Sequence, residues 1–145
     1  MSETPAAVIP CPFCGTSNRV DPARLDQGPR CGECRRPLHL DRQIKVTASQ
    51  FDQTLAGTTI PVLVDFYADW CGPCRMLAPV VDQFAGGHAG RVLVLKLDTD
   101  QAPEVSERLG IRGIPALIAF RAGKETGRHV GLAQAAQLVA LAGVG

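Results

Sequence analysis

The six cysteines of this 145-residue chain form three pairs with the same C-x-x-C spacing. In chain order the pairs are Cys11 and Cys14, Cys31 and Cys34, and Cys71 and Cys74. Two sulfurs separated by two residues can bind one metal ion together or form a disulfide with each other. The segments around each pair therefore decide which chemistry is expected.

The third pair comes shortly after a nearly continuous apolar run over residues 62–68, which is typical of a central strand covered on both faces. A helix is predicted over residues 73–84, so Cys71 lies at a strand-to-helix junction. Unpaired N–H groups and the positive dipole end of a helix N-terminus stabilise a thiolate and lower its pKa. We expect Cys71 to be the nucleophile of thiol–disulfide exchange and Cys74 to be a more buried resolving thiol. A C-x-x-C pair considered without its surroundings could also be a structural disulfide or half of a zinc site, and these are the alternatives to a redox-active pair.

The two N-terminal pairs are separated by sixteen residues, a spacing typical of a zinc ribbon with two knuckles. We expect one structural zinc ion, which would supply folding free energy to a segment with few apolar side chains. Its ligands would be Cys11, Cys14, Cys31 and Cys34. The alternatives are that His39 replaces one of these cysteine ligands, or that the four cysteines form two disulfides instead of binding zinc. The chain has no nucleotide-binding fingerprint, so no bound organic cofactor is expected.

Composition and charge argue against several classes of partner. The chain has 46% hydrophobic and 20% charged residues, as in a soluble globular protein, and a formal net charge of +1. Because Lys and Arg are not clustered in excess, we expect no nucleic-acid partner and no membrane partner. The N-terminus has no secretion signal, and no run approaches the ~18 apolar residues of a membrane span. A cytoplasmic location is therefore expected, where cysteines serve as metal ligands or catalytic thiols more often than as permanent bridges.

The sequence changes character near residue 43. We assign residues 1–43, which are rich in turn formers, to a zinc-ribbon module, and residues 44–145 to an α/β domain in which strand-like and helix-like runs alternate. The strands predicted in this domain cover residues 62–68, 91–98, 116–121 and 125–130. The helices predicted there cover residues 47–56, 73–84, 103–109 and 133–141, the last with a poor N-cap.

From Ile44 to the C-terminus the sequence resembles the thioredoxin family, most specifically in the motif Trp-Cys-Gly-Pro-Cys over residues 70–74. With the four N-terminal cysteines included, the whole chain resembles the second, zinc-ribbon-bearing class of bacterial thioredoxins. The resemblance implies an α/β thioredoxin fold, a central mixed sheet flanked by helices, with a small N-terminal zinc ribbon. Tyr67 departs from the tryptophan of many relatives, and we expect this to alter core packing more than chemistry.

The resemblance also implies roles for residues outside the C-x-x-C pair. Asp65 matches the family's buried aspartate, and a carboxyl group in an apolar strand should have a raised pKa, which suits a proton acceptor for Cys74. Lys96 matches the lysine close to that aspartate, with an ordinary surface lysine as the alternative. Pro115 matches the family's cis-proline. The apolar surface on which a substrate would dock consists of Trp70, Gly72, Pro73, Ile114, Pro115 and Gly131.

The predicted function is that of a protein-disulfide reductase, because the dipeptide Gly72-Pro73 resembles that of reducing thioredoxins rather than that of oxidants or isomerases. The family implies disulfide-containing proteins as substrates. It also implies an NADPH-dependent flavoprotein thioredoxin reductase as the electron donor. We expect the chain to be a monomer. The alternatives are a disulfide oxidase or isomerase, and a protein-binding or redox-sensing zinc module on a thioredoxin scaffold.

Overall fold

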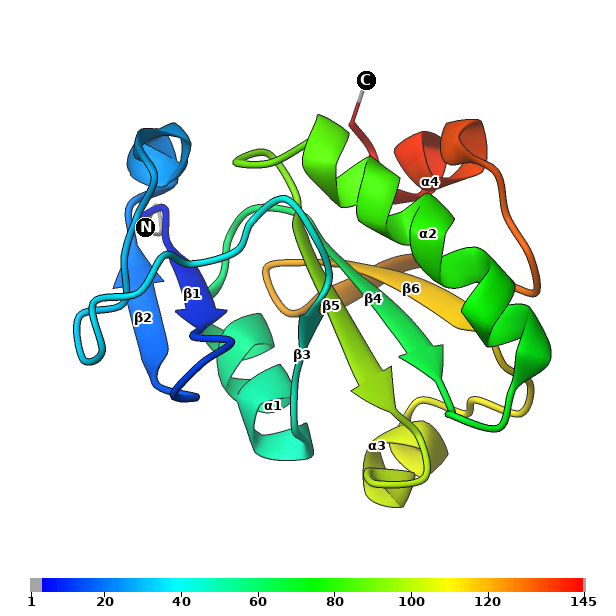
Figure 1. The fold of residues 1–145 in the computed structure, drawn as a ribbon. Helices are drawn as coiled ribbons and strands as arrows, with labels where there is room; N and C mark the ends of the chain where they lie inside the picture. Colours follow the sequence, from blue (N-terminus) through cyan, green and yellow to red (C-terminus); the bar gives the residue numbers. More distant parts are fainter. Residues whose placement is uncertain (1–3, 145) are drawn as a thin grey trace.

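A computed structural model describes residues 4–144 and places a five-stranded mixed sheet between two layers of helices (Figure 1). The strand order is β3-β5-β4-β6-β7, with β4 parallel to β5 and antiparallel to β6. The strands are β3 (Ile44–Lys45), β4 (Val62–Tyr67), β5 (Leu93–Asp98), β6 (Ala116–Arg121) and β7 (Lys124–Val130). This arrangement confirms the predicted thioredoxin fold. The four strands predicted from sequence are present within two residues at each end, whereas the short β3 was not predicted.

Helices cover both faces of the sheet (Figure 1). They are α1 (Ala48–Gly57), α2 (Gly72–Gly87), α3 (Pro103–Arg108) and α4 (Ala135–Ala142). Successive side chains of β4 alternate between the faces. Val64 and Phe66 pack in the cluster on the α1 and α3 side, and Leu63 packs in the cluster on the α2 and α4 side. Asp65, two residues after Leu63, therefore faces the layer that contains α2.

Local sequence signals account for the helix boundaries. The predicted capping box of α1 is present, because the Gln50 N–H donates to Thr47 Oγ1 at 3.2 Å and the Thr47 N–H donates to Gln50 Oε1 at 2.9 Å. The last helix was predicted with a poor N-cap, and it begins at Ala135 after Gln134, whose side chain makes no cap hydrogen bond. The Gln134 N–H donates to Gln137 Oε1 at 2.7 Å. Within residues 4–144, no helix is both long enough and apolar enough to span a bilayer.

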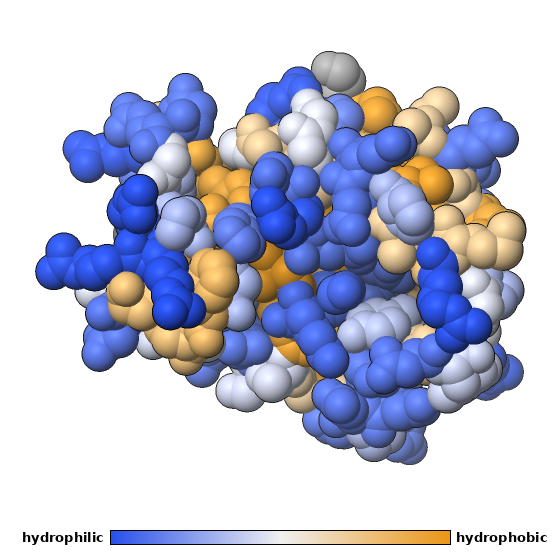
Figure 2. Space-filling view, in the orientation of Figure 1, coloured by the Kyte–Doolittle hydropathy of each residue, from blue (hydrophilic) through white to orange (hydrophobic). Residues whose placement is uncertain are grey.

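The N-terminal segment forms a hairpin and a short 3-10 helix, neither of which was predicted from the sequence. These are β1 (Ala7–Pro10), β2 (Ser17–Val20), paired antiparallel, and η1 (Pro22–Gln27). Its apolar side chains Ile9, Leu25 and Leu38 are buried and belong to the same cluster as the α1 side of the sheet. In Figure 2 apolar residues are visible along the seam between this module and the rest of the molecule, on a face that is otherwise mostly hydrophilic. The segment thus uses the core of the neighbouring sheet rather than one of its own.

Hydrogen bonds fix this module to the end of α1. The Val8 N–H donates to Thr58 Oγ1 at 2.9 Å, and Thr58 is only 2% exposed. One residue further, the Ala6 N–H donates to Thr59 Oγ1 at 3.0 Å and the Thr59 N–H donates back to the Ala6 carbonyl at 2.8 Å. A buried N–H without a partner is costly, so these threonines specify where the hairpin docks.

Candidate functional site

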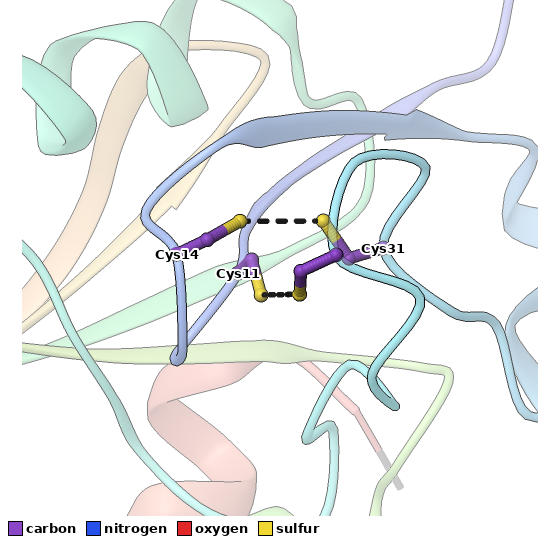
Figure 3. A group of neighbouring side chains, drawn as sticks. Cys11, Cys14 and Cys31 are labelled. Carbon is purple, nitrogen blue, oxygen red and sulfur yellow. Dashed lines mark hydrogen bonds between the residues drawn. The ribbon is translucent and has the colours of Figure 1, made fainter.

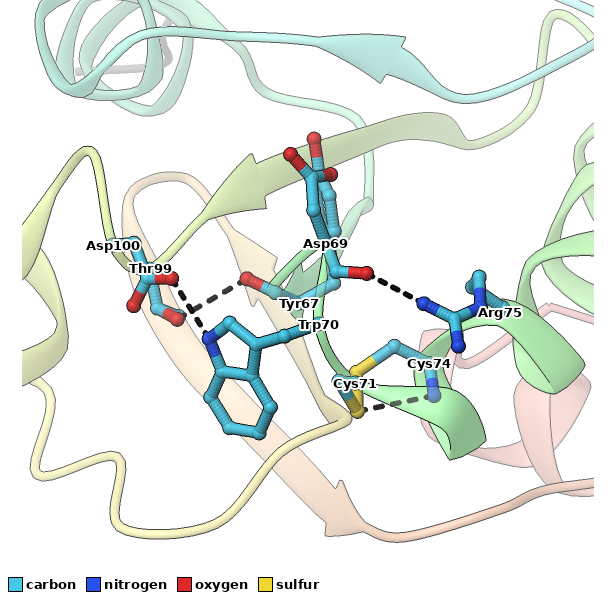
Figure 4. The surroundings of a disulfide bond; sticks show 8 residues. All are labelled: Tyr67, Asp69, Trp70, Cys71, Cys74, Arg75, Thr99 and Asp100. Atoms are coloured by element: carbon cyan, nitrogen blue, oxygen red, sulfur yellow. Dashed lines mark hydrogen bonds between the residues drawn. A yellow bond between two sulfur atoms is a disulfide. The ribbon is translucent and has the colours of Figure 1, made fainter.

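The pair Cys71 and Cys74 lies where β4 passes into α2 (Figure 4). The two sulfurs form a disulfide, with the Cα atoms 5.2 Å apart. Cys71 is the N-cap of α2, and its sulfur accepts a hydrogen bond from the Cys74 N–H at 3.2 Å. Pro73 occupies the first turn, where its missing N–H leaves no helical hydrogen bond unmade. In the reduced protein the Cys71 sulfur would therefore be stabilised as a thiolate by the helix N-terminus.

The two sulfur-bearing residues differ less in exposure than the sequence predicted. Cys71 is 4% exposed and Cys74 is 3% exposed in the disulfide form, so Cys74 is not the distinctly more buried residue. Ala68 and both cysteines form a small apolar cluster, against which Ile114 and Tyr67 pack. The difference between the two thiols therefore depends on their positions in the helix, at the cap and inside the first turn.

Two side chains next to the disulfide are held by hydrogen bonds to the backbone or to a carboxylate. Trp70 is 69% exposed, and its indole Nε1 donates to Asp100 Oδ2 at 2.8 Å (Figure 4). On the other side, Arg75 Nη1 donates to the Asp69 carbonyl at 2.6 Å. The indole ring is thereby fixed beside the sulfurs although most of its surface is in solvent.

The loop before β6 packs against the two cysteines through Ile114. Its Ile114–Pro115 bond is cis, as the family resemblance implied, and the Pro115 carbonyl accepts from the Gly131 N–H at 2.8 Å. Gly131 has a φ of +99°, a conformation that favours glycine. Gly72 is half-buried and Pro73 is exposed, so both can face a docked segment.

Three further apolar side chains near this surface were not predicted from the sequence. Met76 is 65% exposed, Val130 58% and Leu132 50%, and Met76 and Leu132 line one groove between α2 and α4. Their sequence signal is weak, because an apolar residue next to a motif is usually part of the core. Their exposure enlarges the apolar surface beside Cys71.

Asp65 lies behind the disulfide and is 2% exposed. Its burial raises the pKa of the carboxyl group to about 7, an effect that the positive charge of Lys96 opposes and the negative charge of Asp82 reinforces. In the sheet register Asp65 is paired with Lys96 on β5 and with Leu117 on β6. The structure thus places a carboxyl group that titrates near neutral pH next to the C-x-x-C pair.

A cavity of about 190 Å³ connects these groups. Asp65, Cys74 and Lys96 all line it. The Lys96 Nζ lies 5.6 Å from the centre of the Tyr67 ring, so the residue that replaces the family's tryptophan contacts this lysine. The structure therefore brings together the four residues for which the sequence predicted catalytic roles, Cys71, Cys74, Asp65 and Lys96.

The two N-terminal C-x-x-C pairs fold into loops with matching backbone hydrogen bonds. In the first, the Gly15 N–H donates to the Cys11 carbonyl at 3.0 Å, and in the second the Arg35 N–H donates to the Cys31 carbonyl at 3.0 Å. The residue after each pair has a positive φ, +80° at Gly15 and +68° at Arg35. Each turn directs its two thiols toward the other loop.

The four thiols form one cluster (Figure 3). Cys11 Sγ lies 3.6 Å from Cys34 Sγ, Cys14 Sγ lies 3.6 Å from Cys31 Sγ, and all four sulfurs lie within 4.8 Å of one another. Sulfurs that bind one zinc ion at about 2.3 Å are about 3.8 Å apart, so this donor set fits the metal. A hydrogen bond from the Cys34 N–H lowers the pKa of Cys31 to about 6, although burial opposes the shift. His39 is not among the clustered ligand atoms of residues 4–144.

A model of the thioredoxin family matches residues 42–143, well over half of the chain. The chain belongs to the thioredoxin family. A second model, described as the N-terminal part of thioredoxin 2 and named as a zinc ribbon, matches residues 10–36 of this thioredoxin. That segment carries the four clustered cysteines. Both parts of the resemblance seen in the sequence are confirmed.

Known thioredoxins and their solved structures each match between 60% and 71% of the chain. Thioredoxin from Allochromatium vinosum is 44% identical over 100 residues, which cover 69% of this chain and 94% of the relative. Thioredoxin 1 from Nostoc sp. is 48% identical over 87 residues, 60% of this chain and 81% of the relative. Among solved structures, a mutant thioredoxin from Halobacterium salinarum NRC-1 gives a TM-score of 0.65 at 36% identity, covering 71% of this chain and 89% of the other. Chloroplastic thioredoxin z gives 0.63 at 35% identity, covering 70% and 92%.

Family membership and the Cys71–Cys74 disulfide together make this thioredoxin a thiol–disulfide oxidoreductase. The bond drawn in Figure 4 is the one that such an enzyme forms and breaks.

Proposed function

We propose that the protein is a cytoplasmic, monomeric protein-disulfide reductase in which Cys71 is the nucleophile, Cys74 the resolving thiol and Asp65 the proton acceptor. The observation that carries this proposal is the position of the Cys71 sulfur at the N-cap of α2, with a carboxyl group of pKa about 7 behind it. A helix N-terminus favours the attacking thiolate, and a carboxylate that titrates near neutral pH can accept and release a proton within the working range.

The reaction consists of two exchange steps that balance. The Cys71 thiolate attacks one sulfur of the substrate disulfide, forms a mixed disulfide and releases the other substrate sulfur as a thiolate. Cys74 then transfers its proton to Asp65 and attacks the Cys71 sulfur, so that the Cys71–Cys74 bond forms and the second substrate sulfur leaves as a thiolate. Two electrons pass from the dithiol to the substrate, which becomes two thiols after protonation. Lys96, whose charge favours the ionised carboxyl group, would help Asp65 to return its proton to solvent.

The substrates of this reaction would be disulfide-containing proteins. The exposed ring of Trp70 and the loop that contains the cis bond of Pro115 would present an apolar surface to an extended segment, and Ile114, Gly72 and Gly131 complete it. Because the sequence has no nucleotide fingerprint, the electrons would come from a separate protein, and membership of the thioredoxin family implies an NADPH-dependent flavoprotein thioredoxin reductase.

Serine variants of the two cysteines test the proposed mechanism. With a soluble disulfide protein such as insulin as substrate, Cys71→Ser should abolish reduction, because the attacking sulfur is lost. Cys74→Ser should still attack but not resolve, so a covalent enzyme–substrate disulfide should accumulate on a non-reducing gel and disappear with added thiol. Substantial reductase activity in Cys71→Ser, or a trapped complex in Cys71→Ser instead of Cys74→Ser, contradicts the assignment.

The equilibrium potential of the Cys71–Cys74 pair separates a reductase from an oxidase or isomerase. The reduction potential of a reductase should be about −270 mV in equilibrium with thiol buffers, whereas that of an isomerase is about −180 mV and that of a strong oxidant about −120 mV. A value in the latter two ranges would replace the reductase proposal by the oxidase or isomerase alternative.

We also propose that the four N-terminal thiolates hold one structural zinc ion. The ion would supply a cross-link between the two loops and, with it, folding free energy for the hairpin module. Metal analysis of the purified protein should give about one zinc per chain, and a thiol reagent should react quickly with only the two active-site thiols after mild reduction. Finding six fast thiols and no zinc would reject the metal site.

A further inference from the structure

The cavity behind the disulfide is also lined by Gln43, which precedes β3 and had no role in the sequence analysis. Gln43 is 8% exposed, and its neighbours in the cavity wall include Asp65, Cys74 and Lys96. In the sequence it lies directly before β3, at the end of the segment that leads from the zinc-ribbon module to the sheet. A polar side chain this deeply buried, beside the groups that transfer a proton, calls for an account of its hydrogen bonds.

Three hydrogen bonds to α2 hold Gln43 in place. Its backbone N–H donates to Asp82 Oδ1 at 3.0 Å, and its side-chain Nε2 donates to the same oxygen at 3.3 Å and to the Ala78 carbonyl at 3.4 Å. Both partners of Nε2 are acceptors, so a flipped amide would place oxygen against oxygen. The amide orientation is therefore determined by α2, and it leaves Oε1 as the free end of the side chain.

Gln43 Oε1 and Asp65 Oδ1 are both buried atoms with no hydrogen-bond partner among residues 4–144. Both residues line the same cavity, whose volume of about 190 Å³ exceeds the roughly 30 Å³ that a water molecule occupies in the liquid. Two oxygen acceptors cannot satisfy each other while the carboxyl group is ionised. A water molecule can, because it carries two O–H groups and can donate one to each oxygen.

We propose that Gln43 is a positioning residue for the proton transfer from Cys74, and that its Oε1 holds a water molecule that also hydrogen-bonds to Asp65 Oδ1. This inference rests on the proposed role of Asp65 as proton acceptor. The water links the carboxyl group to the mouth of the cavity, where Asp69 and Arg75 are exposed. When Cys74 has given up its proton, the protonated Asp65 donates to the same water, so the contact serves both protonation states.

The charged and titratable groups around Asp65 come from three elements. Lys96 on β5 lowers the pKa of Asp65, and Asp82 on α2 raises it. The remaining groups in the cavity wall are Cys74 and Arg75 on α2, Tyr67 on β4 and Asp69 after it. On the β6 side the register partner is Leu117, which does not titrate. Removal of the Gln43 amide would take away the oxygen that holds the water and the Nε2 donor that bonds to the Asp82 carboxylate. Both changes leave the negative charges less solvated, and they therefore disfavour the ionised form of Asp65.

The test is a measurement of the pKa of Asp65 by carbon NMR of its carboxyl group in the reduced full-length protein. In Gln43→Leu we expect a rise of about half a unit or more, with the same shift in the acidic limb of the pH–rate profile of disulfide reduction. Asp82→Asn keeps an oxygen acceptor for Gln43 but removes the negative charge, so the pKa of Asp65 should fall. Gln53→Leu is the matched control, because Gln53 on α1 contacts Ser17 and lies outside the cavity wall. It should leave the pKa and the profile unchanged.

The outcomes separate the inference from the proposed function. An unchanged pKa of Asp65 in Gln43→Leu, or a lowered one as a direct Asp65-to-Gln43 hydrogen bond would give, overturns the water-bridged arrangement. If Gln43→Leu does not fold, Asp82→Asn remains as the test. A pKa of Asp65 that does not fall in Asp82→Asn overturns the inferred effect of the Gln43–Asp82 contact on Asp65. A pKa that shifts as expected while the pH–rate profile stays fixed supports the contact with Gln43 but rejects Asp65 as the proton acceptor.

Discussion

Replacing Asp65 by asparagine should stabilise the protein at neutral and alkaline pH. Asp65 is 2% exposed, and burial raises the pKa of its carboxyl group from the ordinary 3.8 to about 7. The folded protein therefore holds a proton that the unfolded chain releases at lower pH. Asparagine has nearly the same shape as the protonated acid and cannot ionise, so the variant avoids the cost of a buried charge.

The size and sign of the effect follow from proton linkage. Between pH 3.8 and about 7 the folded state binds more protons at Asp65 than the unfolded state, so the free energy of unfolding falls as the pH rises through this window. Each unit of pKa difference corresponds to about 1.4 kcal/mol, which gives a limit of about 4 kcal/mol above pH 7. Asp65→Asn should thus exceed the wild type by up to about 4 kcal/mol at pH 8 and differ little from it near pH 4.

Urea unfolding of the reduced protein at a series of pH values between 4 and 8 measures this difference. The control is Asp52→Asn, which removes an exposed carboxylate that pairs with Arg108 at 2.7 Å. Exposed ion pairs contribute at most about 1 kcal/mol, so the control should stay close to the wild type throughout. Parallel stability curves for wild type and Asp65→Asn across the whole pH range would refute the reasoning, because they would mean that Asp65 has the same pKa in both states.

Three further changes have expected outcomes. Ala122→Asn should raise the unfolding free energy by about 0.5–1 kcal/mol in thermal or urea unfolding, because Ala122 (φ +50°) and Gly123 (φ +80°) form a two-residue hairpin turn that favours Asn-Gly. A loss of stability would contradict this. Thr58→Val should cost about 1–3 kcal/mol by leaving the partly buried Val8 N–H unpaired, and an unchanged midpoint would show that this bond is dispensable. Removal of zinc by a chelator should lower the melting temperature of the whole chain, since the ribbon shares its core; a melt identical to that of the untreated protein would contradict a structural metal.

The sequence sufficed where local patterns determine structure. The apolar run of β4, the C-x-x-C pair at its end and the proline in the first turn of α2 together predict a sulfur at a helix N-terminus. Asp65 stands out because a carboxyl group is rare inside such a strand. These signals depend on neighbours within a few residues, and all the elements that they predicted are present.

Features that depend on distant partners were beyond the sequence. Gln43 bonds to residues 35 and 39 positions further along the chain, and nothing in its own neighbourhood marks it. Similarly, Leu25 is an isolated apolar residue among polar neighbours in the sequence, although it is buried against the sheet. The expected difference in burial between Cys74 and Cys71 is small, at 3% against 4% exposed, because both belong to one apolar cluster against which Ile114 and Tyr67 pack.

Because the ribbon shares the core of the sheet, it cannot be removed without exposing apolar surface. Ile9, Leu25 and Leu38 cover apolar side chains on the α1 side of the sheet, so cutting the chain before β3 would uncover that surface. Exposed apolar patches promote self-association, and a shortened chain should therefore be prone to aggregate even with an intact disulfide site. Any lineage that discarded the ribbon would have to replace buried apolar residues under it by polar ones.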